Sequence, residues 1–226
     1  MSLPAAVPDT SRLPAAVLFD MDGLLIDTEP LWFSVEGDIL TELGAPWDLN
    51  DHKTLVGSSL KVSSAFIAER AGGSVTAEQI ADELLLRMRE RLRHPQVLRP
   101  GVIDLIAELD AAGIPRALVS SSFRVLVEAA LEGVAPLMFD TVVVGDEVSV
   151  AKPHPEAYLL GARKLGVDPT DCVAFEDSPT GAASASAAGC FVVAIPSVVP
   201  IEPGERRIVR PSLVGVDLTF LRSLFE

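Results

Sequence analysis

Two aspartates separated by one residue follow an apolar run near the start of the chain, in "VLFDMDGLLIDTEP" at residues 17–30. Aspartate is a poor strand residue and is costly to bury without a partner. Asp20 and Asp22 therefore either form a solvated turn with Gly23 after a strand, or they take part in chemistry. This stretch by itself leaves both interpretations open.

Further polar residues follow other apolar runs that are typical of buried strands. The expected strands are residues 15–19, 116–119, 141–144, 172–175 and 191–195. The polar groups after the first four of them are Asp20 and Asp22 with Gly23; Ser120, Ser121 and Ser122; Lys152 in "AKPHPEAY"; and Glu176, Asp177 and Ser178. Parallel strands end at one edge of a sheet, where ligands bind, so we expect these groups to converge.

The segments between the later strands have helical periodicity. Residues 125–131, 155–165 and 179–188 end at Gly133, Gly166 and Gly189, and a glycine just past a helix is a common stop signal. Alternating strands and helices predict a parallel sheet with helices on both faces. The expected fold class is therefore α/β, with a Rossmann-like core domain.

One insertion interrupts this alternation. Residues 30–100 contain helical stretches at 31–43, 58–71 and 76–93 and no convincing strand. This is far more chain than the roughly dozen residues that a crossover connection needs. We expect an inserted helical cap domain at residues 30–99 and a core domain at 12–29 and 100–226, with hinges near 27–30 and 98–101. The alternative is that these helices simply cover the sheet.

The acidic cluster has consequences for charge and metal binding. Several carboxylates at one place cannot all stay ionised without a cation, and hard oxygen ligands favour Mg²⁺ over zinc. No Cys/His set has zinc spacing, and His52, His94 and His154 are scattered, so we expect surface or local structural roles for them. Lys152 is either a surface residue before a helix or a second positive charge. The serines after the second strand either cap a helix or bind phosphate.

Composition limits the function classes. The 226 residues are 49% hydrophobic and 22% charged, as in globular proteins. The net charge of −14 argues against binding nucleic acid or an anionic membrane through a basic surface, and no apolar run is long enough to span a bilayer. The first residues lack a signal peptide pattern, and Cys172 and Cys190 lie in apolar runs. We expect a cytoplasmic monomer with reduced cysteines.

The chain resembles the haloacid dehalogenase superfamily of aspartate-nucleophile phosphotransferases over nearly its whole length. It contains all four family motifs in order, as "DMDGLLID", the serine of "LVSSS", the lysine of "AKPHPEAY" and the acids of "FEDSPTG". The helical insertion resembles the cap of the subgroup that contains β-phosphoglucomutase and sugar phosphate phosphatases. "DMDGLLIDTEPLW" is especially similar to the 2-deoxyglucose-6-phosphate and hexitol phosphatases.

This resemblance implies catalytic roles. Asp20 would attack phosphorus and form an aspartyl-phosphate, and Asp22 would protonate the leaving oxygen and then deprotonate water. Ser120 and Lys152 would bind the oxygens of the transferring phosphoryl group. These are roles that the chemistry of the residues supports.

The resemblance also implies a metal site and a substrate site. Mg²⁺ would be bound by the Asp20 carboxylate, the Asp22 backbone carbonyl and Asp177, with Glu176 in contact or adjacent. The substrate, a small phosphorylated metabolite, would contact the motif residues and side chains of the cap. The candidate substrate-binding residues are Gly23, Ser121, Ser122, Glu29, Trp32 and Lys61.

Departures from the family pattern narrow the function. β-Phosphoglucomutases have a histidine where this chain has Trp32, and an arginine in the region where Lys61 is the only base. Dehalogenases and phosphonatases lack the second acid, which Asp22 supplies here. We therefore expect a Mg²⁺-dependent phosphatase of sugar or polyol phosphates. A sugar phosphomutase and a non-catalytic phosphate-binding protein are the alternatives, and retention of both Asp20 and Asp22 counts against the latter.

Overall fold

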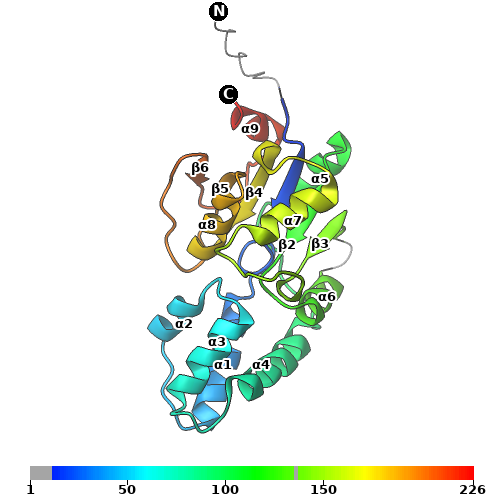
Figure 1. The fold of residues 1–226 in the computed structure, drawn as a ribbon. Coiled ribbons are helices and arrows are strands. Elements are labelled where there is room, and N and C mark those ends of the chain that lie inside the picture. The colour runs from blue at the N-terminus through cyan, green and yellow to red at the C-terminus, as the bar shows by residue number, and fades with distance from the viewer. Residues whose placement is uncertain (1–11, 135–136) are drawn as a thin grey trace, which may run out of the picture.

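The core of the protein is one parallel β-sheet. The computed structural model describes residues 12–134 and 137–226, and these form a sheet of six parallel strands in the order β3-β2-β1-β4-β5-β6 (Figure 1). The strands are β1 Ala16–Phe19, β2 Arg116–Val119, β3 Thr141–Val143, β4 Cys172–Glu176, β5 Phe191–Ala194 and β6 Arg207–Val209. The predicted α/β fold class is confirmed.

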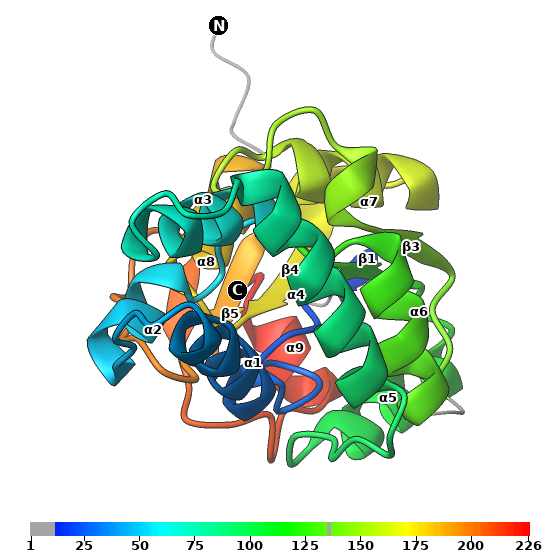
Figure 2. The same cartoon turned by 90° about the horizontal axis from the view of Figure 1, so that it is seen from below.

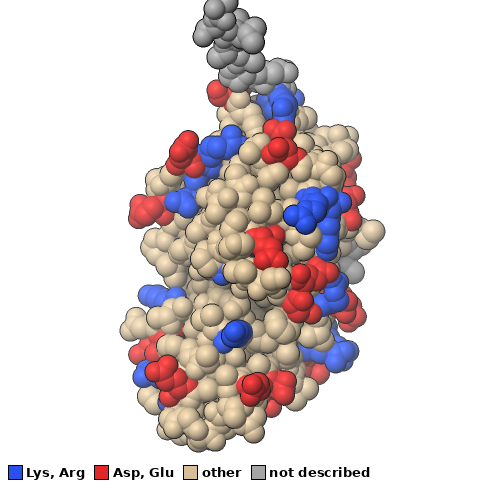
Figure 3. All heavy atoms as spheres, in the orientation of Figure 1, with Lys and Arg blue, Asp and Glu red and all other residues tan. Residues whose placement is uncertain are grey.

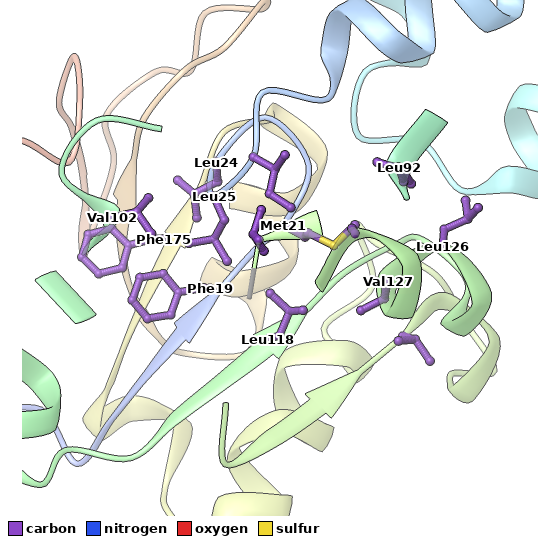
Figure 4. Close-up of a cluster of buried hydrophobic side chains, with 14 of the residues drawn as sticks. Phe19, Met21, Leu24, Leu25, Leu92, Val102, Leu118, Leu126, Val127 and Phe175 are labelled. Carbon is purple, nitrogen blue, oxygen red and sulfur yellow. The ribbon is translucent and has the colours of Figure 1, made fainter. Parts of the chain in front are cut away.

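Helices cover both faces of this sheet. Side chains alternate along each strand, so both faces carry apolar side chains that the helices bury. Val17 and Phe19 of β1 face one side, where α5 (Val102–Ala112), α6 (Arg124–Gly133) and α9 (Leu218–Ser223) pack. The other side is covered by α7 (Glu156–Leu165) and α8 (Pro179–Ala187). Phe19 stacks on Phe175 of β4 with ring centroids 5.3 Å apart, so aromatic packing fixes the two central strands (Figure 4).

The sequence placed most of these elements correctly. The five strands it predicts each match an observed strand to within one residue at either end. Gly166 ends α7 in the left-handed conformation, with φ 72°, as expected for a glycine stop. Gly133, in contrast, is the last residue of α6 and not a stop beyond it. No element was predicted for β6, α5 or α9.

Four helices form a separate group beyond the carboxyl ends of the strands (Figures 1 and 2). They are α1 Glu29–Glu42, α2 Leu49–Leu55, α3 Leu60–Arg70 and α4 Ala77–Leu92, of which α2 was not predicted. We call these four helices the cap; α1 begins at Glu29, one residue before the domain boundary that the sequence predicts. Helix α4 packs on α3 and also on α6 of the core. Its buried Leu84, Met88 and Leu92 belong to the same hydrophobic cluster as the central strand, so cap and core share part of one interior.

The chain enters and leaves the cap through two paired segments. Ile26 and Leu98 form an antiparallel bridge, and the Arg99 N–H donates to the Leu25 carbonyl at 2.8 Å. The predicted hinges therefore lie side by side. Any movement of the cap has to bend both segments at this bridge.

The described residues include no membrane-spanning helix, and the face drawn in Figure 3 is not basic. Among the described helices, none combines the length and the apolar character needed to cross a bilayer. Positive and negative side chains are interspersed over the face in Figure 3. Cys172 and Cys190 are buried free thiols, as expected for core residues. Residues 1–11, where the sequence shows no signal peptide pattern, lie outside the described part of the chain.

The return from the cap depends on Gly101. This residue precedes α5 with φ 93°, and a Cβ atom there would lie 2.4 Å from the backbone carbon of Leu213. We expect Gly101→Ala to lower the free energy of unfolding by about 2–5 kcal/mol, because left-handed strain of about 1–2 kcal/mol adds to an overpacking cost of about 1–3 kcal/mol. Gly113→Ala, at the other end of α5 with φ 65° and open space around it, should cost only about 1 kcal/mol. Urea unfolding of both variants checks this, and equal losses would contradict it.

Candidate active site

Three acidic side chains meet at the carboxyl edge of the sheet. Asp20 follows β1, Glu176 is the last residue of β4, and Asp177 comes next. One carboxylate oxygen from each lies within 4.8 Å of the others, and all three residues are buried. The convergence predicted from the sequence is therefore observed, since β1 and β4 are neighbouring parallel strands.

Lys152 is the cation that contacts these acids. Its Nζ lies 2.7 Å from Asp20 Oδ1 and 2.6 Å from Glu176 Oε1, and it also donates to the Val119 carbonyl. The side chain is only 3% exposed, so the interpretation as a surface lysine is wrong. Glu176 Oε1 also accepts a hydrogen bond from the hydroxyl of Tyr158 on α7. Hydrogen bonds to two carboxylates and one backbone carbonyl thus fix the position of the Lys152 ammonium group.

The charges in this cluster do not balance. Burial raises the pKa of Asp20 and of Asp177 well above the usual value for aspartate, and the neighbouring carboxylates add to the rise. Burial alone would lower the pKa of Lys152, but Asp20 and Glu176 raise it, so the lysine is charged. With all three acids ionised, a surplus of two negative charges remains. A divalent cation would offset it, and the buried oxygen ligands fit Mg²⁺.

The Asp22 side chain contacts both the first cap helix and the serines of the core. Its Oδ1 accepts hydrogen bonds from Thr28 Oγ1 at 2.8 Å and from Trp32 Nε1 at 3.3 Å. Its Oδ2 accepts from Ser122 Oγ at 2.8 Å and from Ser120 Oγ at 3.4 Å. A solvated turn does not require such contacts, so the interpretation of the two acids as plain turn residues is wrong. The Asp22 side chain is held between the core and the first cap helix.

Gly23 packs directly against the acidic cluster. Its φ is +73°, and a Cβ atom at this position would lie 2.0 Å from Asp177 Oδ2. Any other residue would therefore have to displace that carboxylate. Glycine lets the loop after β1 pass this close to the candidate metal ligands. Gly23 therefore has a structural role in the site.

The serines after β2 form the next wall of the site. Ser120 is buried, and its Oγ accepts from the backbone N–H of Ser122 at 2.9 Å. Ser121 and Ser122 line the cavity above the acids. The alternative that a serine caps the following helix is not observed, because the residue before α6 is Phe123 and no side chain caps that helix.

A cavity that is open to solvent lies between the cap and the core. Asp20, Lys152 and Asp177 line it from the core, and Glu29 and Trp32 line it from α1. The loop between α2 and α3 closes one side. A Cβ atom at Gly57 in this loop would lie 2.5 Å from the hydroxyl of Ser178, so cap and core are in close contact there.

Two cap residues lie elsewhere than the sequence predicts. Lys61 is exposed on α3 and is not among the residues that line the cavity. His52 of α2, which was not expected at the site, is buried, lines the cavity and contacts Glu29 and Glu36 of α1. His94 and His154 are exposed, as expected for surface residues.

The sequence matches the haloacid dehalogenase-like hydrolase family over residues 14–189. The chain belongs to the haloacid dehalogenase-like hydrolases. The resemblance inferred from the four motifs is confirmed. The matched residues include the whole cap and the strands that carry the acidic cluster.

Relatives of this haloacid dehalogenase-like hydrolase include named phosphatases. Hexitol phosphatase B of Escherichia coli (strain K12) is 32% identical over 219 residues, which cover 95% of this chain and 96% of the relative. The phosphorylated carbohydrates phosphatase of Thermotoga maritima is 33% identical over 187 residues, or 77% of this chain and 81% of the relative. Among solved structures, CbbY from Rhodobacter sphaeroides in complex with phosphate has a TM-score of 0.81 and 30% identity, covering 92% of this chain and 99% of that one.

Tyr158 and His52 are the residues that sequence reasoning missed in this haloacid dehalogenase-like hydrolase. Tyr158 is the last residue of the motif "AKPHPEAY", six positions after Lys152. Its presence in the same motif as the candidate catalytic lysine could have indicated that its hydroxyl contacts the site, where it donates to Glu176. His52 had no such signal, because its partners come from a different helix.

The surplus of negative charge predicts how the site responds to pH and metal. Asp177 has a raised pKa, so without metal the folded state loses stability as the pH rises above about 4, the value in the unfolded chain. We expect Asp177→Asn to raise the melting temperature in EDTA at pH 7 by about 2–4 °C, equivalent to about 1 kcal/mol, and to reduce the stabilisation by Mg²⁺. Thermal unfolding with EDTA and with Mg²⁺ measures both effects. Exposed Asp104→Asn is the control, and a variant that melts lower than wild type in EDTA would contradict the prediction.

Proposed function

We propose that the protein is a Mg²⁺-dependent phosphatase that hydrolyses small phosphorylated metabolites, namely sugar or polyol phosphates, through an aspartyl-phosphate intermediate. The observation that carries this proposal is the pair Asp20 and Asp22 below the cavity. Asp20 is paired with Lys152, and Asp22 faces the cap. A protein that only binds phosphate does not need the second acid.

The proposed reaction has two steps. A carboxylate oxygen of Asp20 attacks phosphorus, the bond from phosphorus to the ester oxygen breaks, and Asp22 gives its proton to the departing alcohol. Asp22 then takes a proton from water, whose oxygen attacks the phosphorus of the aspartyl-phosphate. The bond between Asp20 and phosphorus breaks, inorganic phosphate leaves, and both carboxyl groups return to their starting state.

The neighbouring groups bind the phosphoryl group and balance its charge. The Lys152 ammonium and the hydroxyls of Ser121 and Ser122 can donate hydrogen bonds to phosphoryl oxygens, because they line the cavity together with Asp20. Ser120, the serine that the sequence predicts for this role, is buried and does not line the cavity, and its hydroxyl contacts Asp22 and the Ser122 N–H. Mg²⁺ would be held by Asp20 and Asp177, with the Asp22 carbonyl and Glu176 close by. When bound it supplies the positive charge that offsets the acidic cluster and the incoming phosphate.

The cap favours a phosphatase over a phosphomutase. A mutase has to bind a bisphosphate, so it needs positive groups on the cap as well as in the core. Among the described residues that line the cavity, the cations are Lys152 and His52, and both are already paired with carboxylates. The names of the relatives in E. coli and T. maritima also support a phosphatase of carbohydrate phosphates.

The proposal also covers the domain organisation, oligomeric state and location of the enzyme. We propose a core domain at residues 12–29 and 100–226 and a cap domain at 30–99, whose cavity-facing residues select the substrate. We also propose that the enzyme works as a monomer in the cytoplasm. Hydrolysis of p-nitrophenyl phosphate with Mg²⁺, and its loss in EDTA, is the first test. No hydrolysis of this ester or of a hexitol phosphate with Mg²⁺ present would refute the proposed function.

Asp20→Asn should abolish turnover and leave the fold intact. The amide is nearly isosteric with the carboxylate but is not a nucleophile. We expect less than about 1% of wild-type activity, because a side chain that takes part in the reaction contributes about 10²–10⁴-fold or more to the rate. Steady-state phosphatase assays and circular dichroism measure activity and fold. Activity above a few per cent in a folded variant would rule out Asp20 as the nucleophile.

Asp22→Asn should affect the second step more than the first. An amide cannot take a proton from water, so hydrolysis of the aspartyl-phosphate should slow by about 10²–10⁴-fold. A phosphorylated enzyme should therefore accumulate with an activated ester such as p-nitrophenyl phosphate, whose leaving group needs little protonation. Rapid-quench measurement of labelled enzyme checks this. Wild-type rates in both steps would show that Asp22 is not the acid/base group.

A further inference from the structure

Two buried carboxylates on the first cap helix share one histidine. Glu29 and Glu36 are seven residues apart on α1, which places them on the same face of the helix two turns apart. His52 lies between them, with Nε2 3.0 Å from Glu29 Oε2 and Nδ1 2.9 Å from Glu36 Oε2. All three residues are buried and all three line the cavity.

The imidazole ring is fixed in this position. The rings of Phe33 and Trp47 lie edge-on to it, with centroids 5.4 Å and 6.1 Å away. Burial alone would lower the pKa of His52, but its hydrogen bonds to Glu29 and Glu36 raise it to about 9. The ring is therefore protonated at neutral pH, and each of its nitrogens donates to one carboxylate.

Glu29 has hydrogen-bonding capacity left over. One of its oxygens is bound to His52, whereas Oε1 has no hydrogen-bond partner in the described part of the chain. Glu36, which is 2% exposed, is the more deeply buried of the two acids. With both carboxylates ionised and the imidazole protonated, the three groups carry one net negative charge, and they line the same cavity as Lys152 from helices α1 and α2. This wall can accept hydrogen bonds and repels a second anionic group.

We propose that Glu29 selects substrates by accepting hydrogen bonds from hydroxyl groups on the carbon chain of the phosphate ester, and that His52 is the positioning residue that holds Glu29 in place. The inference rests on the proposed phosphatase function and refines it. The hydroxyl-bearing body of the substrate lies against the cap while its phosphate lies against Lys152. A second phosphate or a carboxylate in place of the hydroxyls is disfavoured by the charge of Glu29.

The experiment compares a hexitol 6-phosphate with n-hexyl phosphate. The two esters have the same chain length and the same phosphate and differ in their hydroxyl groups. We expect Glu29→Ala to lower the ratio of their kcat/KM values, hexitol over hexyl, by about 10–100-fold, mainly through KM, as for the loss of a hydrogen bond to a charged group. Both esters are measured on the same sample, so partial unfolding cancels from the ratio. Glu42→Gln, an exposed position on the same helix, should leave it unchanged.

Two substitutions of His52 test the positioning role. A glutamine can place its amide nitrogen where Nε2 lies and donate to Glu29, whereas an asparagine places its nitrogen near Nδ1 and donates to Glu36. We expect His52→Gln to keep the ratio within about threefold of wild type and His52→Asn to lower it about tenfold or more. A purely structural histidine would lower the melting temperature in both variants and leave the ratio alone.

Each result supports or overturns one part of the inference. An unchanged ratio in Glu29→Ala would overturn the assignment of Glu29, and equal ratios in the two His52 variants would overturn the positioning role. In both cases the wild type still hydrolyses the esters, so the proposed function stands. A wild-type protein that hydrolyses neither ester with Mg²⁺ present would overturn the proposed function and this inference together.

Discussion

The site depends on buried negative charge that one lysine only partly neutralises. Asp20, Glu176 and Asp177 lie within reach of a single ion, and Lys152 contacts two of them. Bringing such groups together is unfavourable without a cation, so the rest of the fold has to force them into contact. The paired central strands do so, and glycine makes it sterically possible: a Cβ atom at Gly181 would lie 2.0 Å from Glu176 Oε2.

The cap is linked to this charge cluster through Asp22. Two residues after the nucleophile candidate, this carboxylate accepts hydrogen bonds from Thr28, just before the cap, from Trp32 of the first cap helix and from Ser122 of the core. Insertion of the cap directly after β1 therefore has a chemical consequence. The orientation of Asp22 depends on where α1 lies, so a change in cap position changes the environment of the proposed acid/base group.

The sequence predicted the core better than the cap, for a physical reason. Apolar runs that end in acids identify buried strands, and parallel pairing then brings Asp20 and Asp177 together without further information. Helix α2 has little apolar periodicity and is set by a local capping box of Asp48 and Asp51, which went unnoticed. The burial of His52 comes from contacts with residues 16 and 23 positions away, which no local pattern encodes. Lys61 was predicted as the only base in the region where β-phosphoglucomutases have an arginine, but on α3 its side chain is exposed to solvent.

The core wall and the cap wall of the cavity favour opposite kinds of chemical group. In the core, Lys152 and the Mg²⁺ that we propose for the acidic cluster would attract a phosphate dianion despite the net charge of −14. On the cap, Glu29 and Glu36 outweigh His52, so this wall attracts hydrogen-bond donors and repels anions. A substrate with one phosphate and a neutral hydroxylated body satisfies both walls in a single orientation. A bisphosphate satisfies only one of them, which is the electrostatic basis of our proposal that this chain is a phosphatase and not a mutase.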